Sequence, residues 1–197
     1  MVLNILHEYE TGELPSEIDP KNNIFVVLEN RKSGKKRFWY GSNLVTNDGD
    51  IYYAKRGAGE DGATNENFEQ GKCILQNPTS TPPIAKTDTW LQINTGSTTT
   101  GNPIAASHDA LESGYPKSND LSSDNDGKNP DAVTYKYYWD TTNNWTGIFG
   151  GCIVDQAYAS LVDATKLLTH WAFAAAFAKT DNDTLTLYVN HTMNGVT

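Results

Sequence analysis

The chain of 197 residues is long enough to bury a core without a disulfide or a metal, and its net charge of -9 argues against a protein built to wrap nucleic acid. Asn, Asp, Thr, Gly and Ser are plentiful, and the 10 Tyr and 5 Trp add to a composition that favours strands and turns over helices. The acidic net charge leads us to expect no direct contact with nucleic acid. No apolar run of about 18 residues is present and no signal-peptide pattern opens the chain, so we expect no membrane span.

Residues 1–23 begin with a short apolar tip that contains Leu3, Ile5 and Leu6. The stretch TGELPSEIDPKNN follows, and its glycine and prolines interrupt any regular element. This pattern predicts an extended N-terminal arm that docks on a neighbour through the apolar tip. A frayed chain end is the alternative interpretation.

Residues 24–83 predict an antiparallel β-meander. IFVVLEN and RFWYGSNLV read as two strands joined by the polar turn RKSGKK, and IYYA follows the turn NDGD as a third strand. The rest of this region reads as loop. The stiff stretch TPPIAKTD then marks a boundary, after which residues 84–197 are expected to form a second domain.

The turn of this hairpin carries an unusual concentration of positive charge for an acidic chain. Lys35, Lys36 and Arg37 follow Arg31 and Lys32 within seven residues. We interpret Lys35, Lys36 and Arg37 as a contact to an acidic patch on a partner. A solvated hairpin tip is the alternative interpretation.

Residues 84–131 are expected to hold one strand, TWLQIN, and one short helix, IAASHDALES, followed by a long polar loop. The most informative stretch is Lys166 to Lys179, KLLTHWAFAAAFAK. Its alternation predicts a strand buried on both sides, with Trp171, Phe173 and Phe177 facing the core and Leu167 on the same side. The high Ala content favours a helix instead. The turn and strand pattern KTDNDTLTLYV that follows supports the strand.

No metal or catalytic motif stands out. HxxH, HExxH, CxxC and G-x-S-x-G spacings are absent, so we expect neither an enzyme nor a cofactor. The loop from Ser122 to Gly127 faintly resembles a calcium loop, but Val133 stands where the loop needs Glu, and a solvated turn is the main interpretation.

Two further questions stay open at the level of sequence. Cys73 and Cys152 read as buried residues, and a disulfide would require their segments to meet. The aromatic pairs Trp39-Tyr40 and Tyr52-Tyr53, and Trp145, read as core or interface residues, with sugar stacking as the alternative.

Four pieces of the C-terminal half have a familiar order: WLQINTGSTTTGNP, AVTYKYYWD, GIFGGCIVD and LLTHWAFAAAFAKTDNDTLTLYVN. Together they resemble a β-rich domain of tailed-bacteriophage virion proteins, over residues 89–193. The resemblance implies a β-sandwich or jelly-roll-like domain that has a structural role, needs no cofactor and assembles as a homo-oligomer.

The sequence therefore predicts a mainly β protein: a β-sandwich or jelly-roll-like domain with an N-terminal meander and arm. The function that we expect is that of a capsid decoration or cement protein. Its partners would be the major capsid protein and copies of itself, in a virion assembled in the host bacterial cytoplasm. A neck, tail or fibre component is the first alternative, and a carbohydrate- or receptor-binding module is an alternative of another class.

Overall fold

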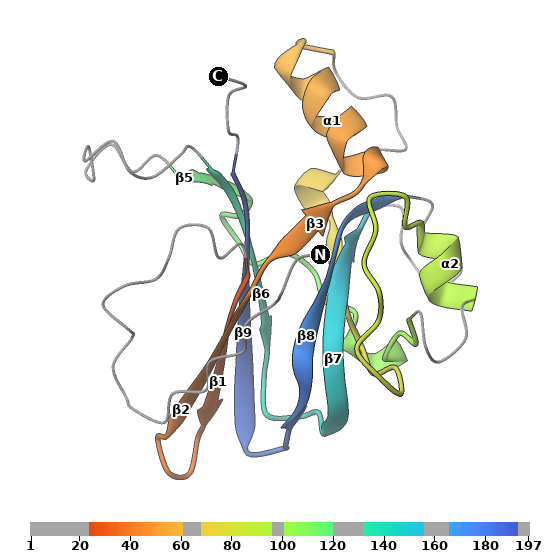
Figure 1. Ribbon diagram of the computed structural model, residues 1–197. Helices are drawn as coiled ribbons and strands as arrows, with labels where there is room; N and C mark the ends of the chain where they lie inside the picture. The colour runs from red at the N-terminus through yellow and green to blue at the C-terminus, as the bar shows by residue number, and fades with distance from the viewer. Residues whose placement is uncertain (1–23, 61–67, 96–100, 120–131, 156–165, 193–197) are drawn as a thin grey trace.

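The computed structural model describes residues 24–60, 68–95, 101–119, 132–155 and 166–192, in which two antiparallel sheets face each other (Figure 1). The five-stranded sheet has the order β2 (Lys36–Gly41), β1 (Ile24–Asn30), β9 (Asp183–Thr192), β6 (Ala132–Trp139) and β5 (Lys117–Asn119). The four-stranded sheet has the order β3 (Asn43–Val45), β8 (Leu167–Lys179), β7 (Trp145–Val154) and β4 (Lys72–Gln76).

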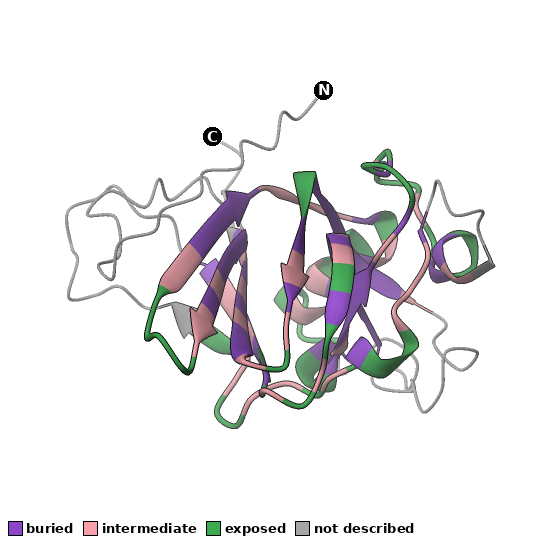
Figure 2. Ribbon diagram, turned by 90° about the horizontal axis from the view of Figure 1, so that it is seen from below, coloured by how far each residue is buried: buried purple, intermediate pink, exposed green. Residues whose placement is uncertain are grey.

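The main hydrophobic core lies between the two sheets. Alternate residues of β1, β6 and β9 meet alternate residues of β4, β7 and β8 there, as expected for sheets packed face to face. Figure 2 shows the strands largely buried, with exposed residues gathered in the turns. The prediction of a mainly β, sandwich-like fold is confirmed.

The predicted hairpin of the N-terminal region is confirmed as β1 and β2, but its third strand is wrong. Residues 51–54 belong to helix α1 (Asn47–Gly57). The side chain of Thr46 caps this helix by accepting a hydrogen bond from the Gly49 N–H, and acidic residues in the first turn and basic residues in the last complement the helix dipole. NDGD is therefore the first turn of a helix, and the predicted meander is limited to a hairpin.

The chain changes sheet within the segment that we predicted as one strand, RFWYGSNLV. Only Ser42 separates β2 from β3, and β3 pairs with β8 of the opposite sheet. On the other side, β1 pairs with β9. Strands from residues 24–83 and from residues 84–197 thus share both sheets and the core between them.

Three elements between residues 72 and 107 differ from the sequence-based expectation. KCILQ forms strand β4 where we expected loop, and TWLQIN forms helix α2 (Trp90–Thr95) where we expected a strand. The expected helix at IAASHDALES is only a short 3-10 turn, η2 (Ala105–Ser107); a second such turn, η1, covers Phe68–Gln70. Helix α2 begins with a capping box, because the Thr89 N–H donates to the Gln92 side chain at 2.8 Å and the Gln92 N–H donates to the Thr89 hydroxyl at 3.3 Å.

Strand β8 confirms the strand interpretation of residues 167–179, and Trp171, Phe173 and Phe177 lie in the main core. The prediction of burial on both sides is wrong for residues 174–176, which are exposed. The prediction that Leu167 shares the side of Trp171, Phe173 and Phe177 is also wrong. Ile153 of β7 pairs with Thr169, whereas the next residue, Val154, pairs with Leu167, so β8 holds one extra residue there. This irregularity turns Leu168 into the main core and Leu167 toward the other side of the sheet, where it packs with Trp90 and Ile93 of α2.

Gly151 of β7 leaves the space that Trp171 fills. A Cβ atom at position 151 would lie 2.6 Å from the Trp171 ring atom Cζ2 and 2.9 Å from the Ile74 carbonyl oxygen. Gly151→Ala is therefore expected to lower the free energy of unfolding by about 2 kcal/mol or more, since the backbone of β4 prevents relaxation.

Urea unfolding of the two proteins measures this difference. Gly57→Ala, at the end of α1, is the matched control, because nothing lies within 4 Å of the added carbon. Alanine there should leave stability unchanged or raise it by up to about 1 kcal/mol. Equal midpoints for Gly151→Ala and wild type would show that the strands separate easily at this point.

Candidate partner-binding surface

The side chain of Asn30, at the end of β1, organises the hairpin turn. The side-chain oxygen Oδ1 of Asn30 accepts hydrogen bonds from the backbone N–H groups of Lys32 and Ser33, at 3.2 and 3.0 Å. The backbone N–H of Asn30 donates to the Lys35 carbonyl oxygen at 2.8 Å, and the backbone carbonyl of Asn30 accepts from the Gly34 N–H. Gly34 has φ +69°, a conformation that glycine adopts without strain. The turn that carries the basic residues is therefore well ordered.

The turn between β8 and β9 supports this hairpin from the side. The Asn30 amide donates to the Asp183 carboxylate at 2.9 Å, and the Arg31 N–H donates to the Asn182 carbonyl at 2.8 Å. Asp183 also accepts from the N–H and the hydroxyl of Thr180, at 2.9 and 2.7 Å. Partial burial alone would raise the pKa of Asp183, but the hydrogen bonds from Thr180 and Asn30 and the nearby Arg37 charge outweigh it and lower the pKa. Asp183 stays ionised and holds the two turns together.

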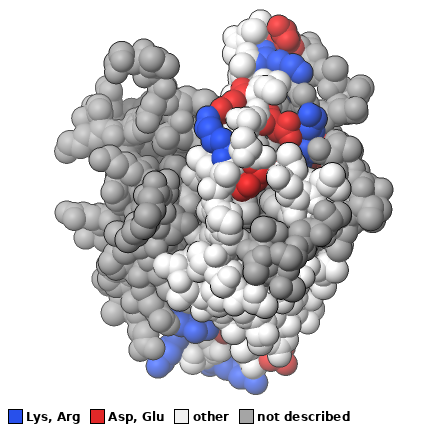
Figure 3. Space-filling model, turned by 45° about the vertical axis from the view of Figure 1, so that its right-hand side comes forward, with Lys and Arg blue, Asp and Glu red and all other residues white. Residues whose placement is uncertain are grey.

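The two turns enclose a hollow of ≈ 300 Å³ at the lower end of the sandwich. Lys35, Lys36 and Arg37 line it together with Asn30, Ser33, Thr180 and Asp183. Figure 3 shows basic side chains gathered at this end of the molecule with acidic ones beside them, and side chains of both signs at the opposite end. We call the group of five basic residues the cationic end: Arg31, Lys32, Lys35, Lys36 and Arg37.

The strand register distributes these charges over both faces of the hairpin. Lys36 pairs with Glu29, and their side-chain charges lie 3.8 Å apart on the outer face. Arg37 points to the inner face, where its guanidinium lies 5.5 Å from the centre of the Trp39 ring. The three predicted contact residues therefore surround one hollow but approach it from different sides. Arg31, at 4.0 Å from Glu29, shares the same carboxylate as Lys36.

Sequence reasoning found the cations and missed the residues that position them, namely Asn30, Thr180 and Asp183. The signals were an Asn directly before a polar turn and the sequence KTDND between two predicted strands. Leu3, Ile5 and Leu6 of the predicted arm, and the loop from Ser122 to Gly127, lie outside the described residues.

Cys73 and Cys152 are both buried and free. In the ladder of β4 and β7, Ile74 is the residue opposite Cys152, and Cys73 is opposite Ile153. Because neighbouring residues of a strand point to opposite faces, Cys73 faces the main core and Cys152 faces α2. The two thiols lie on different sides of one sheet and cannot form a disulfide.

Of the aromatic residues considered for sugar stacking, Trp39, Tyr52 and Trp145 are buried in the main core and Tyr53 is half-buried against it, whereas Tyr40 is buried on the outer side of the five-stranded sheet. The interpretation as core residues is confirmed for Trp39, Tyr52 and Trp145. A ring without an exposed face cannot stack on a sugar, so these residues give no support to the carbohydrate-binding alternative.

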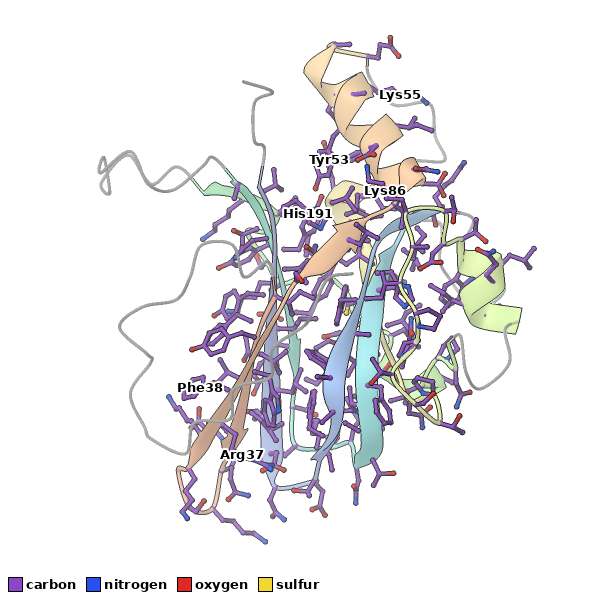
Figure 4. The ribbon with its side chains drawn as sticks, in the orientation of Figure 1. Arg37, Phe38, Tyr53, Lys55, Lys86 and His191 are labelled. Carbon is purple, nitrogen blue, oxygen red and sulfur yellow. The ribbon has the colours of Figure 1, made fainter. Side chains whose placement is uncertain are left out.

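A second polar cluster lies at the opposite end of the sandwich, under α1. The hydroxyl of Tyr53 forms a hydrogen bond with Nδ1 of His191 on β9 and lies 3.4 Å from the Tyr135 hydroxyl (Figure 4). Burial lowers the pKa of His191 to about 3, and its Nε2 atom has no hydrogen-bond partner in the described structure. Burial likewise raises the pKa of the Tyr53 phenol. The cluster is neutral and fastens α1 to the five-stranded sheet.

In the parts of the chain that the structure describes, no group of three or more His, Cys, Asp or Glu side chains is placed to hold a metal ion. No helix found there is long and apolar enough to cross a bilayer. The cationic end gathers five basic side chains, and positive charge of this kind attracts negatively charged groups.

No protein-family model, no curated protein and no solved structure matches this chain. The resemblance of residues 89–193 to phage virion proteins stays a prediction from sequence.

Proposed function

We propose that this protein is a structural component of a tailed-bacteriophage virion, a decoration or cement protein that binds the major capsid shell. The proposal begins from the four sequence pieces between residues 89 and 193 that resemble such virion proteins. The two-sheet sandwich agrees with the fold that this resemblance implies. In this proposal the protein is assembled into the virion in the host bacterial cytoplasm.

The cationic end is the observation that carries the contact. Five basic side chains lie on an ordered turn and on the first two residues of β2, in a chain whose net charge is -9, so positive charge is concentrated locally in an acidic protein. An acidic patch on a capsid subunit would attract this tip and orient the rest of the molecule. Because these charges are exposed or only partly buried, the attraction should weaken as salt is added.

The mechanism is adhesion. A decoration protein adds buried area between neighbouring capsid subunits, and a stable contact needs about 1,200–2,000 Å² in total. The hairpin tip alone is too small for such an area. Copies of this protein that contact one another, as a homo-oligomer, would supply the remainder.

Reversal of two charges at the tip tests the contact. Lys35→Glu/Lys36→Glu is expected to weaken binding to capsid shells by about tenfold or more and to reduce the salt dependence of binding, because attraction is replaced by repulsion. Lys55→Glu/Lys86→Glu is the matched control, with the same change of charge at the opposite end of the molecule (Figure 4). Its loss of the exposed Lys86–Asp50 ion pair should cost little stability.

Co-sedimentation with purified shells lacking this protein, at several salt concentrations, measures the binding. Equal binding of the tip variant and the control would remove the cationic end from the contact. Wild-type protein that fails to sediment with shells at low salt would contradict the capsid role. A copy number of only a few per virion on a gel would support the neck, tail or fibre alternative instead.

A further inference from the structure

The outer side of the five-stranded sheet carries a second hydrophobic cluster, separate from the core. We call it the outer aromatic face and define it by Phe25, Val27, Phe38, Tyr40 and Tyr188. The Phe25 ring is its centre, with ring centroids of Phe38 at 5.7 Å, Tyr40 at 5.2 Å and Tyr188 at 6.0 Å. The strand neighbours of these residues, such as Val26 and Trp39, point into the main core. The outer aromatic face is therefore the reverse side of the same strands.

This face is buried although the described residues place no helix over it. Phe38 is 1% exposed and Tyr40 is 5% exposed. Helix α1 lies at the end of the sandwich and α2 on the far side of the other sheet (Figure 1), while Phe38 points away from both sheets' shared core (Figure 4). Tyr138 of β6 lies on the same outer side, since its neighbours Tyr137 and Trp139 are in the core, and it is 39% exposed. The large side chains buried on this side thus lie on β1 and β2, whereas β6 leaves Tyr138 exposed.

We propose that residues 1–23 of this chain dock on the outer aromatic face and cover it. The segment leads directly into β1, whose second residue is Phe25, and 23 extended residues reach roughly 75 Å, several times the length of the strand. Its tip contains four apolar residues of the size that such a face accepts, Val2, Leu3, Ile5 and Leu6.

Charge complementarity supports the same occupant. Residues 1–23 contain the acids Glu8, Glu10, Glu13, Glu17 and Asp19 against Lys21 alone, which gives a net charge of -4 with His7 neutral. The basic residues of the cationic end lie at the hairpin end of the same strands, next to Phe38 in sequence. An acidic segment with an apolar tip therefore matches a surface that is aromatic on β1 and β2 and basic at their turn.

The other segments outside the described ranges fit this face less well. Residues 61–67, 96–100 and 120–131 contain almost no large apolar side chain, and residues 156–165 join two strands of the opposite sheet. Residues 193–197 are few and include only Met193 and Val196 as apolar side chains of useful size. The N-terminal segment is the one that combines reach, apolar residues and charge. The sequence predicted that it docks on a neighbour; the outer aromatic face offers it a place on its own chain.

Hydroxyl-radical labelling read by mass spectrometry tests the proposal on the full chain, with no capsid present. In wild type, Phe38 and Tyr40 should be labelled far less than Tyr138. In Leu3→Ser/Ile5→Ser/Leu6→Ser, labelling of Phe38 and Tyr40 should rise severalfold, because the apolar contacts of the segment are lost. Tyr137, in the main core, should stay protected in both and so reports that the sandwich remains folded.

Two further measurements complete the experiment. Ile51→Ser/Leu91→Ser removes exposed apolar residues from the two helices and should leave the labelling pattern unchanged. A peptide of residues 1–10, added to the triple variant, should restore protection, whereas a scrambled peptide should not. Protection of Phe38 and Tyr40 that survives the triple substitution would overturn the proposal. So would protection in wild type that disappears on dilution, since the segment would then come from a second copy.

Discussion

Trp171→Ala is expected to lower the free energy of unfolding by about 3–5 kcal/mol, the range for a large aromatic side chain removed from a core. Trp171 is fully buried at the centre of β8, between the two sheets. Its ring fills the space that Gly151 leaves open on the neighbouring strand. Because β7 is held by β4 on its other side, the backbone cannot close around the cavity. The cost should therefore lie toward the upper part of the range.

Urea unfolding followed by far-UV circular dichroism measures this cost. Trp171→Phe should cost less than Trp171→Ala, because it leaves a smaller cavity and removes a buried indole N–H that has no hydrogen-bond partner in the described structure. Leu91→Ala is the matched control for loss of apolar volume at a side chain that is 68% exposed, and it should change stability by less than about 0.5 kcal/mol. Similar values for Trp171→Ala and Leu91→Ala would contradict the assignment of β8 to the centre of the core.

The sequence predicted this strand correctly because its signal is local. The large side chains Trp171, Phe173 and Phe177 fall on one side of the alternation and show which side faces a core, whatever the strand's partners are. It could not predict that Leu167 turns to the other side. The extra residue in β8 arises from its pairing with β7, a strand about 15 residues away. The register of two paired strands cannot be predicted from the sequence of one strand alone.

The two missed helices had readable signals. T-x-x-Q at Thr89 is a capping box, and Thr46 precedes two acids and two bases arranged for a helix dipole. The aromatic pair in IYYA and the alternation in TWLQIN led us to predict strands in both places, because aromatic residues favour strands. Gly49 supplied the misleading turn signal. In the structure it is glycine for another reason: a Cβ there would lie 2.3 Å from the Leu168 carbonyl oxygen.

The sequence predicted the basic residues of the candidate site but not how they are arranged in space. Lys35, Lys36 and Arg37 are visible as a basic cluster in an acidic sequence. Their arrangement around a hollow depends on the hydrogen bond between Asn30 and Asp183, which are 153 positions apart. Contacts between turns that distant follow from the topology of the sheet, and a single sequence does not contain them.

The cluster under α1 leads to the second large effect, a loss of stability in mild acid that depends on His191. The ordinary pKa of a histidine is 6.5, and burial holds that of folded His191 at about 3. Below pH 6.5 the unfolded chain binds a proton that the folded chain does not accept. Each pH unit from 6.5 downward should therefore lower the free energy of unfolding by up to about 1.4 kcal/mol, until the pH approaches 3. Above pH 6.5 the residue adds no pH dependence.

The free energy of unfolding is best compared between pH 7 and pH 5, before most carboxylates titrate. Over this range His191 should lower it by about 2 kcal/mol. His191→Gln should lose that part of the pH dependence, because an amide does not titrate while its oxygen can still accept from the Tyr53 hydroxyl. His108→Gln, which makes the same substitution at an exposed ring, is the matched control. If His191→Gln and wild type lost equal stability between pH 7 and pH 5, the ring could not be buried in its neutral form. Amide hydrogen exchange locates the effect: α1, which Tyr53 fastens to β9 through this ring, should lose protection at pH 5 before the strands do.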